Sequence, residues 1–395
     1  MKTFNIPKRI ESLGEPSSLA ILRRVLELRE QGIPVINFSS RGDTPTHVKD
    51  AAIEMLLSRE NSTYTDVRGL SALRESIAKK LYIQNKFEAN PETEIIVTLG
   101  AGEGISSTLL ALLETDDEVL LEDPCFLGFE PVVKLAGARP VRIQLSEDDD
   151  FRLSIEALCD RVTPKTRLLM LCNPNNPTGR VFEYEELKGI AKVADEFNFL
   201  VLIDEAYEYF TYDGRTHTSM AALDRELSRR IITVQTVSKI YHMHGWRVGW
   251  VVAHSELIKP ILATHSRLVT CPASFTQAGA IAALEGSLAE GDVPIPELIC
   301  SYQERRDVMV TALNSISGVQ CAVPQGAYFA FPDCKSFGIS SIELSSYLLE
   351  SGGVATTPGR AFGENGEGRL RLNFTCPLTE IEQGVSQIAE ALVRI

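Results

Sequence analysis

The chain has 395 residues, enough to bury a large core and to divide into two domains. Its composition, 44% hydrophobic and 23% charged, is ordinary for a globular protein, and its formal net charge of −14 disfavours a nucleic-acid partner. No apolar run is long enough to span a membrane, and the N-terminus lacks the apolar core of a secretory signal.

Cysteine and histidine usage points to a reduced compartment and to no metal site. The eight cysteines are scattered, none forms a Cys-x-x-Cys pair, and several stand in apolar strands. This pattern favours buried thiols and a cytoplasmic location. His242 and His244 form a His-x-His pair, but no further ligand stands at a suitable spacing, so we expect no metal there.

In chain order, the predicted elements alternate between apolar strands and helical patterns, which is typical of an α/β protein with a mostly parallel sheet. Helices are predicted over 17–31, 70–85, 101–113, 127–137, 184–197 and 255–268. Seven strands are predicted near 94–99, 118–122, 139–143, 167–172, 199–203, 231–236 and 247–253. A helical stretch over 277–316, broken around 291–296, leads into a smaller α+β region that contains 327–331, 342–351 and a final helix over 378–393.

Lys239 follows an apolar run with β-branched residues, which is typical of a buried strand. A lysine is costly to bury, because its ammonium must lose its hydration. At this position the amine can form an imine with a carbonyl cofactor, while Thr236, Ser238 and Arg247 bind a phosphate of the same cofactor. Taken alone, a Ser-Lys pair is more often a surface lysine in the turn after the strand, and the rest of the chain reverses that preference.

Five segments, in this order, resemble the class I/II aminotransferases, which are fold-type-I enzymes that use pyridoxal phosphate (PLP). They are Gly100-Ala-Gly-Glu after the strand 94–99, Asn173-Pro-Asn-Asn-Pro-Thr-Gly, Val201-Leu-Ile-Asp-Glu-Ala-Tyr, Ser238-Lys-Ile-Tyr-His-Met-His-Gly-Trp-Arg, and Arg369-Leu-Arg-Leu-Asn-Phe. The match runs from about Pro7 to the C-terminus. The resemblance implies a large PLP-binding domain over 46–290, with a mostly parallel seven-stranded sheet. Residues 1–45 and 291–395 would form the small α+β domain.

The resemblance assigns roles around the cofactor ring. Asp204 would pair with the protonated pyridine nitrogen, which keeps its carboxylate ionised. Glu205 would point to the other side of the strand. Asn176 and Tyr207 resemble the pair that hydrogen-bonds the ring hydroxyl, although Asn-Pro-Thr-Gly by itself is also a plain turn sequence. Phe126 matches an aromatic residue that stacks on the ring.

Further residues are assigned to the phosphate and to the substrate. Gly100, Ala101 and Gly102 offer N–H groups at a helix start, and Ile105 breaks the Gly-x-Gly-x-x-Gly pattern of a dinucleotide site. Tyr64 matches a tyrosine that reaches the phosphate of the partner subunit, which implies a homodimer with shared sites. The acidic charge and the lack of a long apolar run predict no nucleic-acid and no membrane partner.

Arg371 resembles the arginine that binds the substrate carboxylate as a fork. Arg369 lies two residues earlier on the same face of the strand, and spacing to Asn373-Phe374 favours Arg371.

The substrate side departs from the family pattern in two places. The loop over 38–45 is about two residues shorter than in relatives and lacks their Gly-Glu-Pro-like motif. Gly42 or Ser40 is a candidate replacement for its backbone contact to the substrate. Arg41 is unexpected, and either pairs with a distal polar group of the substrate or braces the loop through an acid such as Asp43. His244 stands where relatives often have threonine or serine.

These features predict an aminotransferase that moves the α-amino group of an L-amino acid to a 2-oxo acid, with Lys239 as imine-forming residue and general base. Another PLP enzyme of the same fold, such as a C–S lyase, a cyclising synthase or an amino-acid oxidase, would use the same cofactor residues. A ligand-sensing module of a transcription regulator is a third hypothesis, disfavoured by the acidic charge and by the absence of a DNA-binding segment before Pro7.

Overall fold

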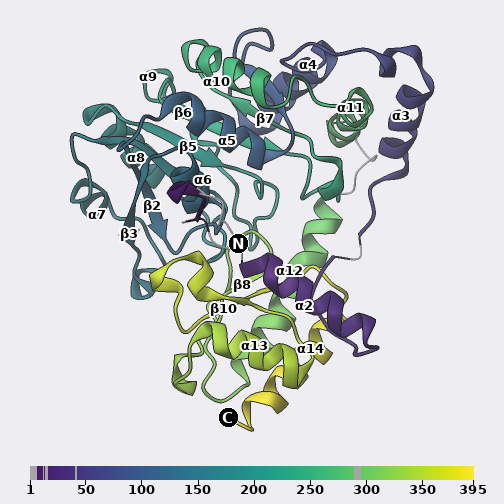
Figure 1. Ribbon diagram of the computed structural model, residues 1–395, viewed down its shortest axis with the longest axis vertical. Helices are drawn as coiled ribbons and strands as arrows, with labels where there is room; N and C mark the ends of the chain where they lie inside the picture. Colours follow the sequence, from purple (N-terminus) through teal and green to yellow (C-terminus); the bar gives the residue numbers. More distant parts are fainter. Residues whose placement is uncertain (1–6, 12, 14–16, 41, 289–294) are drawn as a thin grey trace, which may run out of the picture.

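The fold has two parts, which Figure 1 shows one above the other in a computed structural model. The structure describes residues 7–11, 13, 17–40, 42–288 and 295–395. The larger part is built on a seven-stranded sheet, and the smaller part on a three-stranded one. The strands of the large sheet are β1 (Ile95–Thr98), β2 (Glu118–Asp123), β3 (Arg139–Gln144), β4 (Thr166–Cys172), β5 (Leu200–Asp204), β6 (Ile231–Thr236) and β7 (Gly249–Val252).

The large sheet has the strand order β1-β7-β6-β5-β4-β2-β3 and is mostly parallel, as predicted. Only β7 runs against its neighbours β1 and β6. The connection from β6 to β7 contains one short 3₁₀ turn and no crossover helix, which a parallel return normally requires. All seven predicted strands are present.

Helices cover both faces of the large sheet. Val119 and Leu121 of β2 pack in one hydrophobic cluster with Ile105, whereas Leu120 packs in a second cluster with Leu187. Because successive strand residues point to opposite faces, this division places α5 (Ala101–Leu112) on one face and α8 (Tyr184–Glu196) on the other. α10 (Ser255–Leu268) packs beside α5.

The predicted helices are found with small shifts at their ends. The remaining helices of this part are α3 (Thr46–Leu57), α4 (Ser71–Lys80), α6 (Phe129–Leu135), α7 (Ile155–Cys159), α9 (Arg225–Ser228) and α11 (Ser274–Leu288). The predicted helix over 70–85 closes with a π-helical turn, Leu81–Asn85. Helix α3, which packs along α11, was not predicted. The predicted break at 291–296 begins outside the described residues, and α12 (Ile295–Asn314) resumes the helix.

The smaller part joins both ends of the chain. Its strands are β8 (Phe329–Ala330), β9 (Thr357–Pro358) and β10 (Leu370–Asn373), and its helices are α13 (Ser341–Gly352) and α14 (Leu378–Leu392). Helix α2 (Ser17–Glu30) buries Val25 and Leu28 against Leu349. Ile36 forms a parallel bridge with Val354. Helix α2 and Ile36 therefore pack on the smaller part, whereas α1 (Lys8–Glu11) contacts α6 of the larger part. The domain boundaries at 46 and 290 stay predictions.

Candidate active site

The carboxyl ends of β4, β5 and β6 meet at one edge of the large sheet. Asp204 ends β5 and pairs in register with Cys172 of β4 and Val234 of β6. The Asn173 N–H donates to the Asp204 carbonyl at 3.0 Å, which places the Asn-Pro-Asn-Asn-Pro turn beside the end of β5. In open α/β sheets this edge is where ligands bind.

Asp204 is a buried acid without a cationic partner in contact. Its carboxylate accepts one hydrogen bond, from the Ala206 N–H at 3.0 Å, and no other hydrogen bond or ion pair joins it to the described residues. Burial raises the pKa of Asp204 to about 6, although the Ala206 hydrogen bond and the charge of Lys239 oppose that rise. A cationic ring nitrogen at this carboxylate would supply the missing counter-charge, so the residue fits PLP.

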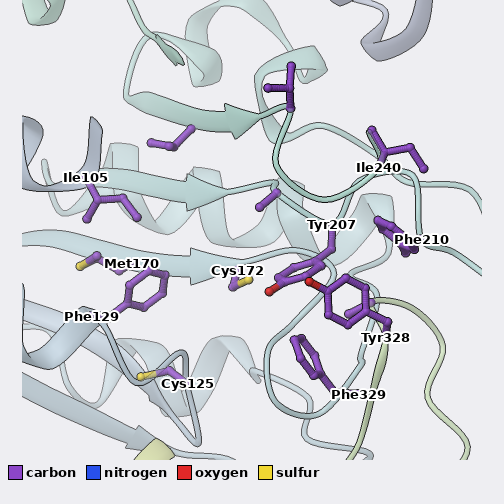
Figure 2. Close-up of a cluster of buried hydrophobic side chains, with 14 of the residues drawn as sticks. Ile105, Cys125, Phe129, Met170, Cys172, Tyr207, Phe210, Ile240, Tyr328 and Phe329 are labelled. Carbon is purple, nitrogen blue, oxygen red and sulfur yellow. The ribbon is translucent and has the colours of Figure 1, made fainter. Parts of the chain in front are cut away.

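Lys239 faces an aromatic wall. Its Nζ lies 5.5 Å from the centroid of the Tyr207 ring. Figure 2 shows Tyr207 beside Tyr328 and Phe329, with edge-to-face ring centroids 5.2 Å and 5.4 Å apart. Burial raises the pKa of Tyr207 well above its ordinary value, so its hydroxyl stays protonated and can donate a hydrogen bond.

Arg371 lies at the other end of this row of aromatic rings, next to Phe329. Its guanidinium lies between the rings of Phe329 and Phe362, 4.4 Å and 4.9 Å from their centroids, and Nη1 donates to Asn176 Oδ1 at 3.0 Å. Nε is buried and has no hydrogen-bond partner among the residues that the structure describes. Burial lowers the pKa of Arg371, but arginine keeps its charge in proteins. A fixed guanidinium with an unused buried donor suits a bidentate carboxylate.

Arg369, which directly precedes β10, is engaged in other contacts, and this distinguishes it from Arg371 within β10. Its guanidinium pairs with Glu147 and with Asp333, at 2.9 Å from the latter. It also stacks 5.3 Å from the Phe151 ring centroid and is 2% exposed. These contacts link the two parts of the molecule and leave Arg371 as the candidate for substrate.

Gly100, Ala101 and Arg247 lie together and form a candidate anion site, called the cradle below. Helix α5 begins at Ala101, and Gly100 has the left-handed φ of 79°. Arg247 Nη2 donates to the Leu99 carbonyl at 3.3 Å, and a Cβ on Gly100 would lie 2.5 Å from the same Nη2. The guanidinium therefore lies beside the start of α5, where the first N–H groups of a helix favour an anion such as a phosphate. A Cβ on Gly102 would meet nothing within 4 Å.

The two predicted hydroxyls differ in how far they are engaged. Thr236 Oγ1 donates to the Val248 carbonyl at 2.7 Å and accepts from the Ser238 N–H at 3.1 Å. The two hydroxyl oxygens are 2.8 Å apart. Since the Thr236 proton is used on Val248, Ser238 is the hydroxyl whose proton can turn to an incoming phosphate.

The remaining predicted residues are spread around the site. Phe126 lies in the turn after β2, where its ring meets Phe129 edge to face at 5.5 Å. Tyr64 is 87% exposed and lies between the 3₁₀ turn Arg59–Ser62 and α4. Gly42 packs on the ring of His242. Arg41 lies outside the described residues.

His244 begins the 3₁₀ turn after Lys239. Its carbonyl accepts from Arg247 Nη1 at 2.9 Å. Burial, followed by the charges of Lys239, His242 and Arg247, lowers the pKa of its imidazole to about 4. His244 is therefore neutral at physiological pH.

Glu205 points away from Asp204 into a buried polar cluster. Its carboxylate accepts from Ser219 and Gln235, and lies near His217 and Glu208. These carboxylate and imidazole groups are close enough to hold a cation. However, the Lys80 ammonium already fills that role at 2.5 Å from Glu208. The Lys80 charge therefore balances part of the negative charge of this buried cluster.

The sequence did not single out the aromatic residues that hold Arg371. Phe329 stands in the alternating run Ala327-Tyr-Phe-Ala-Phe331, and Phe362 ends the segment Pro358-Gly-Arg-Ala-Phe. The first segment was predicted to lie in the smaller α+β region, and the second precedes the motif Arg369-Leu-Arg-Leu-Asn-Phe. Which rings face the arginine depends on the pairing of β10 with β8 and β9, which local patterns do not reveal.

Comparisons with known proteins agree with this geometry. The family model described as aminotransferase class I and II matches residues 34–388. The chain is 36% identical to the probable aspartate/prephenate aminotransferase of Aquifex aeolicus, with 99% of each chain covered. It is similar in structure to an aromatic aminotransferase of Pyrococcus horikoshii (TM-score 0.87, 36% identity, 95% of this chain and 99% of that one). It also resembles the aspartate aminotransferase of Thermus thermophilus with maleate (TM-score 0.91, 28% identity, 98% and 100%). The chain therefore belongs to the class I and II aminotransferases and is a PLP-dependent enzyme of fold type I.

Proposed function

We propose that Lys239, Asp204 and Arg371 are the central active-site residues of this aminotransferase. The observation that carries the proposal is the continuous row of contacts from Lys239 through Tyr207 and Phe329 to Arg371. When bound, PLP supplies an electron sink for the substrate carbanion. Asp204 would hold the ring nitrogen, and Arg371 would hold the α-carboxylate, so that the substrate Cα lies between them and near Lys239 Nζ.

In this arrangement Lys239 is the general base. With an amino acid in its place on the cofactor, the free amine would be able to remove the Cα proton and return it to the former carbonyl carbon of the cofactor, on the far side of the substrate nitrogen. Tyr207 and Asn176 would donate to the oxygen of the cofactor ring. Asn176 already orients Arg371 through its Oδ1, which leaves its amide N–H₂ for that oxygen.

The phosphate would lie in the cradle of Gly100, Ala101 and Arg247. Ser238 would add its hydroxyl, and Thr236 would act mainly by orienting Ser238. Gly102 would allow close approach on the first turn of α5, and Phe126 would cover the ring.

We propose a homodimer in which Tyr64 reaches the partner's phosphate. Support comes from the apolar side chains that α3 leaves exposed beside it, including Ile53 at 52% and Leu57 at 84%. Mixing Tyr64→Phe with Lys239→Ala subunits should restore activity, because one site of each hybrid then carries neither change. Tyr82→Phe, an exposed tyrosine on the closing turn of α4, is the matched control. If mixing restores nothing, Tyr64 does not serve the partner's site.

The donor is an L-amino acid, and acidic and aromatic side chains are the first to test, because the relatives are named for aspartate, prephenate and aromatic amino acids. The eight free thiols support a reducing, cytoplasmic location.

Borohydride reduction followed by peptide mapping tests the assignment of Lys239. Single-turnover titration with each donor, followed at the cofactor absorbance, then tests the substrate class. A label on another lysine would overturn the assignment.

A further inference from the structure

The mouth segment, residues 38–40 and 42–45, lies against the lysine loop at one end. Ser40 Oγ is 3.4 Å from Nδ1 of His242. His242 lies three residues after Lys239, and its N–H donates to the Lys239 carbonyl at 3.4 Å. A contact to His242 is therefore a contact to the turn that presents the catalytic lysine.

The other end of the mouth segment is tied to the strand that carries the substrate arginine. Thr375 Oγ1 donates to the Phe38 carbonyl at 2.8 Å, four residues after Arg371. The Phe38 ring is 1% exposed and packs so closely on Gly384 of α14 that a Cβ there would lie 2.6 Å from it. The segment thus bridges the two ends of the candidate site.

Gly42 and His242 make the tightest contact along this bridge. A Cβ built on Gly42 would lie 2.6 Å from Nδ1 of the imidazole and nearer still to two other ring atoms. Gly42 N–H donates to Ser40 Oγ at 3.1 Å, so ring, hydroxyl and backbone form one cluster. His242 itself has a φ of 52°, a left-handed conformation that costs about 1–2 kcal/mol for an L-residue with a Cβ. The chain thus holds this imidazole in place at a cost in backbone energy.

Neighbouring groups orient the same cluster. Thr44 Oγ1 donates to the His242 carbonyl at 3.0 Å and accepts from Trp246 Nε1 at 3.2 Å. Tyr302 of α12 hydrogen-bonds Ser40. These contacts hold the backbone on either side of the ring, but the imidazole is the group in direct contact with Gly42.

We propose that His242 is a positioning residue that fixes the mouth segment between Lys239 and Arg371 and so prepares the substrate side of the site. The proposal rests on the aminotransferase activity of the family and on the role of Arg371 proposed above. It implies that loss of the imidazole weakens amino-acid binding while the cofactor remains bound.

The test uses two single substitutions and their combination in the holoenzyme. His242→Ala removes the ring. Gly42→Ala forces either the ring or the segment to move, so it breaks the same contact from the other side. We expect each to raise the apparent Kd for an amino-acid donor about tenfold in single-turnover titrations, with a much smaller change in the limiting rate, as loss of a preorganised contact does. The double variant should be no worse than His242→Ala alone, because the clash needs both groups.

Two further variants separate positioning from general damage. His242→Asn tolerates the left-handed φ and can bond Ser40, so it should recover part of the affinity. Gly352→Ala is the glycine control, since its Cβ would meet Ala391 at an ordinary 3.4 Å. Cofactor absorbance should be unchanged in every variant. Multiplied losses in the double variant, an unchanged Kd in His242→Ala, or loss of bound cofactor would each overturn the proposal. If borohydride does not label Lys239 in the wild-type enzyme, that result counts against the proposed function and not against the role of His242.

Discussion

The cofactor side and the substrate side of the site are built differently. On the cofactor side, each candidate group comes from the end of a strand of one sheet, and short contacts fix it: Asp204 by Ala206, and Ser238 by Thr236. On the substrate side, the contacts join residues far apart in sequence, such as Arg371 to Asn176 and Ser40 to His242. The first side is positioned mainly by the sheet, with Tyr207 also packed on Tyr328 and Phe329 of the smaller part. The second side exists only when both parts of the molecule are in place.

This difference separates what binds the cofactor from what selects the substrate. A change in the smaller part should alter substrate affinity without loss of cofactor. A change at the sheet edge should affect both, because the substrate binds on the cofactor. Variants on the two sides therefore have distinct expected signatures.

The largest effect is expected where the two sides meet, at Lys239. Lys239→Ala should lower turnover by about 10³-fold or more, since it removes both the nucleophile and the base. Cofactor should still be retained through the Arg247 cradle. Steady-state rates and cofactor absorbance measure the two effects, and Lys259→Ala on the exposed face of α10 is the control. Near-normal turnover would remove Lys239 from the mechanism.

On the substrate side, Arg371→Lys should reduce kcat/KM for amino acids by about 10²-fold, because an ammonium cannot form the bidentate fork. Cofactor affinity should change little, because the Arg371 guanidinium reaches the cofactor side through its hydrogen bond to Asn176. Equilibrium dialysis with PLP checks this second expectation. A parallel loss of cofactor would show that the two sides are not separable.

On the cofactor side, Asp204→Asn should stabilise the cofactor-free protein while it impairs turnover. Burial raises the folded-state pKa of Asp204 to about 6 from 3.8, so wild-type stability falls as pH rises between these values. The variant should gain about 2–3 kcal/mol of unfolding free energy above pH 6 and nothing below pH 4. Urea denaturation of the apoprotein across this range is the measurement, and a gain that is independent of pH would contradict the mechanism.

The smallest expected effect is a change in PLP affinity, which is tested by comparing substitutions at two glycines of the phosphate cradle. Gly100→Ala meets Arg247 and requires a φ of 79°, so it should weaken PLP binding about tenfold. Gly102→Ala has open space for its methyl group and should be nearly neutral for the fold. Dissociation constants from PLP titration of the two apoproteins check the ratio. Equal losses would mean that helix flexibility, and not the cradle shape, limits binding.

The strands and the helix start on the cofactor side could be predicted from the sequence, because they lie in short segments with a local signature, whereas the roles of their residues stay predictions. The run before Lys239 identified β6, and Gly100 marked the start of α5. The antiparallel course of β7 was not predicted, since apolar alternation carries no direction. Helix α3 was missed for a related reason: Val48 and Ala52 are its only fully buried positions, which leaves little amphipathic signal. The contact of His242 with Gly42 spans 200 residues and depends on how the two parts pack, so no local pattern encodes it.

The bridge between Ile36 and Val354 has a consequence for how the protein is made. Ribosomes add about 5–20 residues per second, so Ile36 emerges at least 15 s before its partner at Val354 exists. The seven-stranded sheet, complete at Val252, can form during this wait. The apolar face of α2, with Val25 and Leu28, stays uncovered until Leu349 arrives. A chain truncated before Leu349 would therefore have a complete large sheet and an N-terminal helix with an exposed apolar face. Such a chain would be a substrate for chaperones and not a partly active enzyme.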